Sequence, residues 1–594
     1  MNSTPRFVLV APVVAALALA ASVPASAQIQ LAGVWNPRTH EDQLDRGPGP
    51  DLGDYTGLPI NDAARLFAES WDASRLTLQE HQCRVHVAPY IYHGPLRLRI
   101  WEEKDPETQQ IIAIKNYIST YEQTRTIWMD GRPHPSPFAP HTFMGFSTGV
   151  WEGDVLKVTT THLKQGWLRR NGVPESDQTT VVEHFVRHGQ YLTHLAIISD
   201  PVYLAEPLIR STDFQIAVED NGPWLWPCEY VEEIAGKSKV AVPHYQPGQN
   251  PFIKEYLAAT HVPATSAGGG PETTYPEYES QLTARRTPPL SAAASPRVSQ
   301  APNPDTGAIE WLRVQGNVHL LAGAGGNVVV QVGDSGSLLV DSKSAAVTDR
   351  IMGEVKRLSV SPKPVRYLLN TSADVDHVGG NQNLAGALGS AANWEIVNTP
   401  GATNNAVQII AHDNVLKRMS KMPITAQPTE TFVGREKEFF FNGEPVFMYH
   451  VPAAHTDGDS IVFFRRSDVI ATGDVYRTDS YPVIDRERGG TVQGVIDALN
   501  LVLELAVPAH HEEGGTYIVP GHGRISDEFD VLEYRDMVTI VRDRIEAMAS
   551  KGMTLEQIKA ARPTRDYDPR YGATTGSWTT DQFIEAVYRT LPRK

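Results

Sequence analysis

The chain has 594 residues, and its 69 acidic residues outnumber its 53 lysines and arginines to give a formal net charge of −16. This negative balance argues against a nucleic acid or an anionic membrane surface as a partner. The length exceeds what one hydrophobic core serves, so we expect two or more domains.

The first 27 residues have the pattern of a signal peptide. Arg6 precedes an apolar core over residues 7–23, and Ala25-Ser26-Ala27 forms a cleavage site of small residues. The mature chain would begin at Gln28 and be exported, either to the periplasm or out of the cell. The alternative is a membrane anchor, although the apolar stretch is short for a span. No later stretch reaches about 18 apolar residues, so no stable anchor is expected in the mature protein.

The chain has two cysteines, Cys83 and Cys228. Export to an oxidising compartment favours a disulfide between them, and two buried thiols are the alternative. A bridge would close most of the N-terminal half of the chain.

Residues 28–262 are expected to form a mostly β N-terminal domain, built as a barrel or a sandwich. Residues 31–35 carry the G-x-W that opens many small β-barrels. Alternating apolar and polar residues around short turns indicate paired strands. The predicted strands lie within 149–163, 181–186 and 191–198, and the predicted helix covers 61–71.

Several histidines of this domain raise the question of a metal site there. No pair of them shows a ligand spacing with a neighbouring carboxylate, so we interpret them as core or solvated histidines. They are His81, His86, His93, His134, His141 and His184.

Residues 263–304 change to a composition of Ala, Ser, Gly, Pro and Thr without apolar runs. Such a composition predicts an extended linker. We therefore expect the domains on either side to fold separately.

Residues 305–594 follow an α/β pattern, in which short apolar strands alternate with amphipathic helices. The predicted strands are 318–321, 327–332, 337–341, 365–369, 429–441, 445–450, 460–464, 468–472 and 516–519. The predicted helices are 345–358, one beginning at 381, 491–505, 531–549, one that begins with a capping box at 554, and 581–591.

Polar residues follow the predicted strand 365–369 in the order N-T-S-A-D-V-D-H-V-G-G-N. Asp374, Asp376 and His377 therefore lie on a strand-to-helix loop, where their side chains can converge. Carboxylates and imidazoles suit a divalent metal. Gly379 and Gly380 let the backbone pass close to that point without a Cβ in the way.

This stretch resembles the signature T-H-x-H-x-D-H-x-G-G of the metallo-β-lactamase superfamily. The matching residues are Thr371, Asp376, His377, Gly379 and Gly380. Ser372 and Asp374 stand where the family has its first two histidines. Further segments follow in the family's order, namely His455 in H-T-D-G-D-S, Asp474 in A-T-G-D and His522 in V-P-G-H-G. The resemblance implies an α/β fold class, with a four-layer αββα sandwich for residues 305–594.

The resemblance also implies a metal centre. One tightly bound divalent metal is expected at Asp376, His377, Asp474 and His522. A second metal would take the positions of Ser372, Asp374 and His455. Because a hydroxyl is a poor ligand and a carboxylate a usable one, we expect weaker binding there. Zinc is the family's expectation, and two histidines with a carboxylate also suit iron or manganese.

These features predict a metal-dependent hydrolase that directs a metal-bound hydroxide at a small-molecule ester, lactone or amide. Asp376 or Asp374 would orient the water and take up its proton. Tyr476 is a candidate contact for a substrate oxyanion. The alternatives are a non-hydrolytic, iron-type metalloenzyme and an exported binding protein whose second domain is structural. The oligomeric state is left open.

Overall fold

The structure is a computed structural model that describes residues 29–38, 49–94, 96–119, 121–218, 227–229, 231, 241–278, 307–359, 365–388, 407–509 and 515–592. The predicted signal peptide and its cleavage site lie outside these residues, as does the predicted linker from residue 279 onward.

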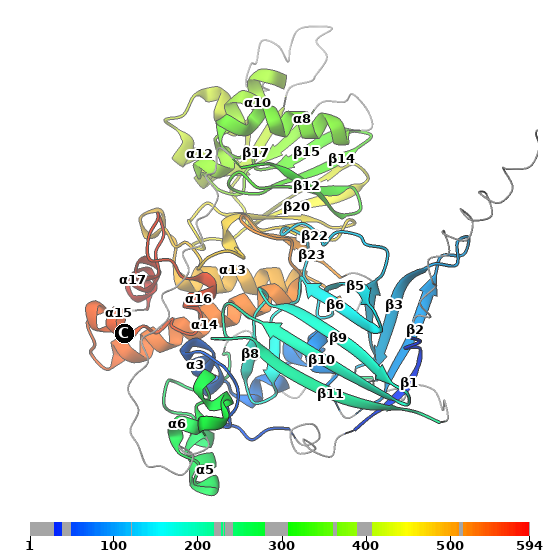
Figure 1. Cartoon of the computed structure of the whole chain (residues 1–594). Helices are drawn as coiled ribbons and strands as arrows, with labels where there is room; N and C mark the ends of the chain where they lie inside the picture. Colours follow the sequence, from blue (N-terminus) through cyan, green and yellow to red (C-terminus); the bar gives the residue numbers. More distant parts are fainter. Residues whose placement is uncertain are drawn as a thin grey trace, which may run out of the picture.

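The strands of the N-terminal domain close into a barrel (Figure 1), in the order β1-β11-β10-β9-β6-β5-β4-β3-β2. Neighbouring strands pair antiparallel except β4 and β5, which pair in parallel. The expected mostly β domain is confirmed, and of the two architectures it adopts the barrel. The barrel strands are β1 (Gly33–Pro37), β2 (Leu98–Lys104), β3 (Ile111–Ile118), β4 (Gln123–Trp128), β5 (Phe146–Glu152), β6 (Val155–Thr161), β9 (Thr180–His188), β10 (Tyr191–Ser199) and β11 (Leu208–Ile216).

A buried ion pair lies among the barrel strands. Arg125 and Glu183 are both fully buried, and Arg125 Nη1 donates to Glu183 Oε1 at 2.8 Å. Ser147 and His194 also form hydrogen bonds with this pair, with His194 Nε2 2.9 Å from Glu183 Oε1. A buried charge is tolerated when it is paired and hydrogen-bonded, so this network is compatible with an otherwise apolar interior.

Shorter elements accompany the barrel in the N-terminal domain. In the helix predicted at residues 61–71, the Asn61 side chain accepts from the Ala64 amide and caps the first turn. The predicted disulfide is confirmed, since Cys83 and Cys228 are bonded with Cα atoms 5.4 Å apart. These elements include α3 (Asp62–Ser70), β7 (Gly166–Arg169), β8 (Val173–Glu175) and α5 (Pro251–Thr260).

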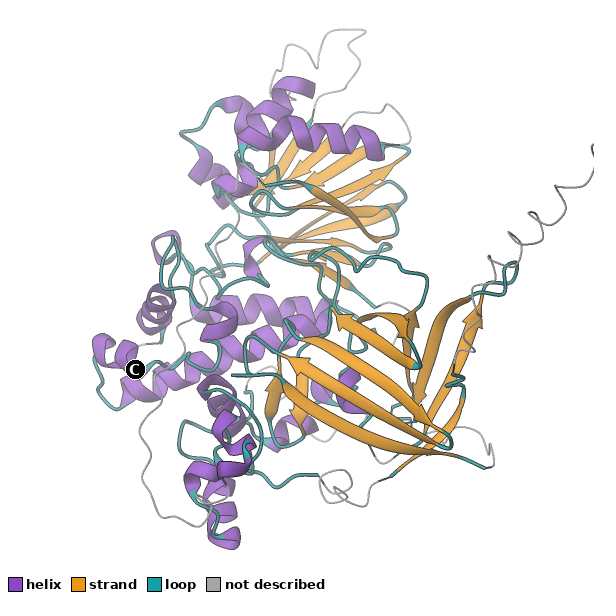
Figure 2. Cartoon of the chain, viewed as in Figure 1, coloured by secondary structure: helices purple, strands orange, loops and turns teal. Residues whose placement is uncertain are grey.

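The C-terminal domain is a sandwich of two sheets with helices on both outer faces (Figure 2). This arrangement confirms the expected αββα layers. The first sheet contains β12 (Glu310–Gln315), β13 (Val318–Ala322), β14 (Val328–Gly333), β15 (Gly336–Val340), β16 (Val365–Leu369), β17 (Gln408–His412) and β18 (Glu430–Phe432). The second contains β19 (Glu436–Phe441), β20 (Glu444–His450), β21 (Ser460–Phe464), β22 (Val469–Ala471) and β23 (Tyr517–Val519).

The helices of this domain bury apolar faces against the sheets and against one another. On the first sheet, Ile351 and Val355 of α8 join a buried cluster with strand residues such as Leu339 and Leu368. On the second sheet, α13 and α14 pack against Ile461 and Ile518. The helices are α8 (Thr348–Leu358), α10 (Asn381–Leu388) and α12 (Asp413–Met419) on the first sheet, and α13 (Val492–Leu505), α14 (Glu528–Ser550), α15 (Leu555–Ala561) and α17 (Thr580–Thr590) beyond the second.

Two sequence predictions are wrong in this part of the molecule. The stretch 429–441 is not one strand, because β18 belongs to the first sheet and β19 to the second. Residues 263–278 are not an extended linker but short helical turns, in which Ala267 and Tyr278 are buried. The Ala267 carbonyl accepts from the Tyr55 amide at 2.9 Å, which ties this segment to the N-terminal domain.

The two domains share a core, which contradicts the expectation that they fold separately. Figure 1 shows α14 between the five-stranded sheet and the barrel domain. The rings of Phe67 and Tyr567 lie 5.7 Å apart across this junction, and His81 Nε2 lies 2.8 Å from Asp536 Oδ2. The Pro/Gly-rich composition between the domains gave no sign of this contact, because the contacting residues are far apart in the sequence.

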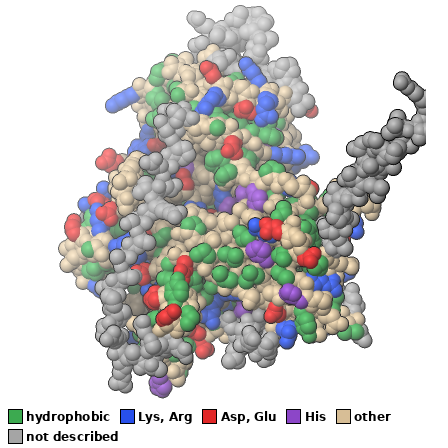
Figure 3. Space-filling view, in the orientation of Figure 1, with side chains coloured by type: hydrophobic (Ala, Val, Ile, Leu, Met, Phe, Trp, Pro, Cys, Tyr) green, Lys and Arg blue, Asp and Glu red, His purple; other side chains and the backbone are tan. Residues whose placement is uncertain are grey.

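Among the residues described, no helix is both long enough and apolar enough to cross a membrane. On the face shown in Figure 3, acidic and basic side chains are interspersed with hydrophobic and polar ones. The net charge of −16 is therefore not gathered into one patch on this face.

Candidate metal centre

The loop after β16 places the first acidic and histidine side chains. β15 and β16 pair in parallel, so their carboxyl ends meet at one edge of the sheet. The short helix α9 (Val375–Val378) follows and carries Asp376 and His377. A Cβ on Gly380 would lie 2.4 Å from the Ser342 carbonyl oxygen, so only glycine allows the loop to pack this closely.

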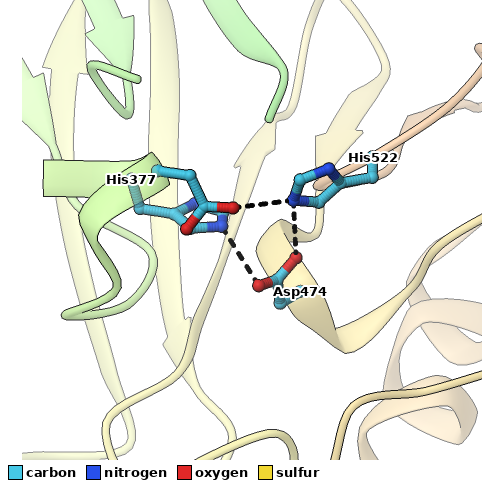
Figure 4. A group of neighbouring side chains, drawn as sticks. His377, Asp474 and His522 are labelled. Carbon is cyan, nitrogen blue, oxygen red and sulfur yellow. Dashed lines mark hydrogen bonds and ion pairs between the residues drawn. The ribbon is translucent and has the colours of Figure 1, made fainter. Parts of the chain in front are cut away.

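Four side chains from three segments converge at this edge, and Figure 4 shows three of them pointing toward one another. His377 Nε2 lies 3.3 Å from Asp474 Oδ2, and His522 Nε2 lies 3.5 Å from Asp474 Oδ1. His522 Nε2 is also 2.9 Å from Asp376 Oδ2. The structure thus brings together the residues that the sequence assigned to the tight metal.

The carboxylate of Asp341 orients the His377 ring by binding the nitrogen opposite the one near Asp474. His377 Nδ1 donates to Asp341 Oδ2 at 2.7 Å, and Asp341 also accepts from the amide and the hydroxyl of Thr371. Asp341 has a φ of +66°, a conformation that costs energy in a residue with a side chain. Sequence analysis missed Asp341, although its place beside β16, just after the parallel strand β15, was a usable signal.

The donor set fits a divalent metal. His377 Nε2 is buried and has no hydrogen-bond partner, while its other nitrogen is fixed by Asp341. An imidazole oriented by a carboxylate, with its free nitrogen facing other acidic and imidazole groups, is a common arrangement of a metal ligand. Two imidazoles and two carboxylates match the ligands of zinc, and also those of iron or manganese.

The acidic surroundings shift the titration of these groups. Burial alone would lower the pKa of His377, but the carboxylates of Asp341, Asp474 and Asp376 raise it well above its ordinary value. Burial would likewise raise the pKa of Asp474, but the charges of His377 and Arg477 hold it well below its usual range. The centre therefore concentrates negative charge, which attracts a cation.

The positions of the predicted second metal are close by but differently partnered. His455 Nε2 lies 2.9 Å from Asp374 Oδ2 and 4.0 Å from Asp474 Oδ2. Arg488 Nη2 lies 2.5 Å from Asp374 Oδ1, a contact that sequence analysis did not foresee. The Ser372 hydroxyl accepts a hydrogen bond from the Asp374 amide at 3.2 Å, so it stabilises the loop conformation.

These contacts also determine the charge states of Asp374 and His455. Burial would raise the pKa of Asp374, but hydrogen bonds with His455 and Arg488 lower it to about 2. Burial would lower the pKa of His455, but the hydrogen bond to Asp374 and the nearby carboxylates raise it to about 9. Asp374 and His455 therefore form a charged pair at neutral pH.

Tyr476 does not contact the centre, contrary to the sequence-based suggestion. It is buried, its hydroxyl lies 3.1 Å from Ser526 Oγ, and its ring packs on Tyr534. The histidines singled out in the N-terminal domain join no cluster that could hold a metal within the described part of the chain.

Comparison with known proteins supports the assignment of this domain. The family model of the metallo-beta-lactamase superfamily matches residues 313–522, the span that contains Asp376, His377, Asp474 and His522. No curated protein matches the chain.

Similar solved structures include the inverting sec-alkylsulfatase Pisa1 from a Pseudomonas species, at 15% identity and a TM-score of 0.38, covering 48% of this chain and 50% of that one. The chain thus spans about half the length of that sulfatase. A metallo-beta-lactamase from Pontibacter korlensis has 14% identity and a TM-score of 0.29, covering 38% of this chain and 99% of its own. One from Hirschia baltica has 15% identity and a TM-score of 0.30, covering 39% and 97%. Residues 313–522 of the sandwich domain thus match the metallo-beta-lactamase superfamily, as the sequence motifs led us to expect.

Proposed function

We propose that the chain is a metal-dependent hydrolase of small-molecule esters, lactones or amides, acting at Asp376, His377, Asp474 and His522. The observation that carries this proposal is the buried His377 Nε2, which makes no hydrogen bond and lies 3.3 Å from Asp474 Oδ2, while Asp341 fixes the opposite nitrogen. When bound, a divalent metal lowers the pKa of a water molecule and polarises a carbonyl oxygen.

The exposure of the acidic side chains separates their roles. Asp376 is 36% exposed, whereas Asp474 is only 5% exposed and lies beneath the imidazoles. Asp376 therefore reaches the solvent side, where it can orient a water molecule and accept its proton. Asp374 is the weaker candidate for this role, because its two oxygens are engaged by Arg488 and His455.

We further propose that the protein works after export, in the periplasm or outside the cell. The signal-peptide pattern of residues 1–27 and the Cys83–Cys228 bond support this proposal, because disulfides persist in oxidising compartments.

A panel of ester, lactone and amide substrates, assayed before and after metal removal with a chelator, tests the proposed reaction. We expect hydrolysis of at least one class, loss of hydrolysis on chelation, and recovery with zinc, iron or manganese. His522→Ala should lower activity more than ~100-fold, because removing a ligand exceeds the usual loss from an outer contact. His188→Ala, an exposed histidine at the end of β9, is the matched control.

Other results would redirect the assignment. Hydrolysis that survives both chelation and His522→Ala would contradict the proposal. Retained iron with oxygen-dependent redox activity and no hydrolysis would favour the non-hydrolytic metalloenzyme. Ligand binding that is unaffected by metal removal, without turnover, would favour an exported binding protein.

A further inference from the structure

A guanidinium is paired with one of the residues to which the superfamily resemblance assigns a second metal. Arg488 Nη2 lies 2.5 Å from Asp374 Oδ1, and the other oxygen of Asp374 lies 2.9 Å from His455 Nε2. Asp374 and His455 are thus both engaged, and His455 Nδ1 also contacts the Val483 carbonyl at 2.9 Å. A metal ion at this position would have to displace or repel the Arg488 guanidinium, which is already paired with Asp374.

The turn that carries Arg488 is fixed to the loop that carries His455. The Asp485 amide donates to the His455 carbonyl at 2.9 Å, and a Cβ on Gly490 would lie 2.2 Å from that same oxygen. The Asp457 amide and Arg418 Nη2 both donate to the Arg488 carbonyl, at 2.9 and 2.8 Å. The backbone of Arg488 is therefore fixed to the loop that carries His455 and to α12.

The Arg488 side chain is also held in position by two carboxylates. Its Nε lies 2.6 Å from Asp485 Oδ2, which leaves Nη2 to reach Asp374. A planar guanidinium that is held by one carboxylate and bonded to another is a pre-organised cation, and the bond to Asp374 is charge-assisted. Arg488 is 28% exposed, so it lies at the edge of the centre rather than in the core.

We infer that the Arg488 guanidinium takes the place of a second metal ion beside Asp374 and His455, so that the centre holds one metal only. This inference rests on the proposed function, which requires the first metal. It replaces the expectation from sequence that a second metal binds weakly.

The inference accounts for both departures from the family signature. A carboxylate at Asp374 pairs with a guanidinium, whereas an imidazole at that position would carry no negative charge to offset it. A hydroxyl at Ser372 hydrogen-bonds within the loop and adds no ligand. Ser372, Asp374 and Arg488 therefore form one consistent set of residues for a site that uses a fixed cation.

The test is metal per chain, measured by elemental analysis of the full chain after equilibration with excess zinc and removal of unbound metal. We expect one equivalent for the parent and for Arg488→Lys, which keeps the positive charge. Ser372→His alone should also bind one, because the guanidinium remains. The double variant Ser372→His with Arg488→Gln should bind two, since it restores an imidazole and removes the cation.

Arg486→Gln is the matched control, because Arg486 belongs to the same turn, is exposed, and removes the same charge. It should bind one equivalent, and thermal unfolding should show that each variant is folded. Two equivalents in the parent would overturn the inference while leaving the proposed function intact. A folded double variant that still binds one would overturn it as well. A parent that binds no metal would overturn the proposed function and this inference together.

Discussion

Asp341 sets the orientation of the most buried histidine of the centre. Its carboxylate accepts from His377 Nδ1 and from Thr371, so an amide in its place would keep the shape but lose the charge. We expect Asp341→Asn to weaken metal binding about 10- to 100-fold without unfolding the chain. Competition with a chelator measures this, with Asp349→Asn on the exposed side of α8 as the control. Equal affinity in Asp341→Asn and the parent would refute the assigned role.

The two candidate proton acceptors are predicted to differ. Asp376 faces solvent beside His522, while Asp374 is held by Arg488 and His455. We expect Asp376→Asn to lower kcat by about 100-fold or more, in the range of general-base catalysis, and Asp374→Asn to lower it less. Steady-state kinetics with metal content measured on the same samples distinguishes them. The opposite order would show that Asp374 accepts the proton.

Much of the centre was predictable at the residue scale, because metal ligands follow strands in short motifs with fixed residue types. Asp376, His377, Asp474 and His522 each stand in such a motif. Arg488 was not predictable, since its partner Asp374 is far away in the sequence and an arginine in a polar turn has no distinctive pattern. Tyr476 was misplaced because sequence proximity to Asp474 does not fix the direction of a side chain.

At the scale of elements, a buried charge network joins the barrel to the segment that carries His522. Asp177, between β8 and β9, lies 3.1 Å from Arg524 Nη2 and 2.6 Å from Arg570 Nε. Asp177→Asn would leave two buried guanidinium groups with less compensation. We expect a loss of about 3 kcal/mol of stability, seen as a lower Tm. Asp154→Asn, in an exposed turn, is the control, and an unchanged Tm for Asp177→Asn would contradict this.

The same charge network predicts a pH dependence of the stability. Burial would raise the pKa of Asp177, but the charges of Arg570 and Arg524 hold it well below its usual range. A carboxylate with a depressed pKa in the folded state contributes stability above its unfolded pKa of about 3.9, and this stability is lost as the pH falls further. The Tm difference between the parent and Asp177→Asn should therefore be constant near neutral pH and narrow below about pH 4. A Tm difference that widens in acid would contradict this prediction.

Sequence patterns located most elements because amphipathic periodicity and capping residues act locally. The hairpin β9–β10 and the capped helices α3 and α15 are examples. The prediction of a single strand over residues 429–441 was wrong because alternating apolar residues indicate strands but do not show which sheet each strand joins. The prediction of an extended linker was wrong for residues 263–278 because their few buried side chains pack on a part of the chain that is distant in sequence.

At the scale of the whole molecule, the shared core predicts one cooperative unit. Phe143 packs on Phe529 with ring centroids 4.9 Å apart, and Lys164 Nζ lies 2.7 Å from Asp527 Oδ1. If a protease site is introduced between residues 279 and 306 and cut, the two fragments should elute together in gel filtration and unfold in one transition. Fragments that separate and unfold at different temperatures would contradict this prediction and show that the domains fold independently.

The most direct test of the account is an anomalous diffraction map of the full chain crystallised with excess zinc. We predict one metal peak, in contact with Asp376, His377, Asp474 and His522, while the Arg488 guanidinium remains paired with Asp374. A map without a peak at these four residues, or with a second peak beside Asp374 and His455, would contradict the account.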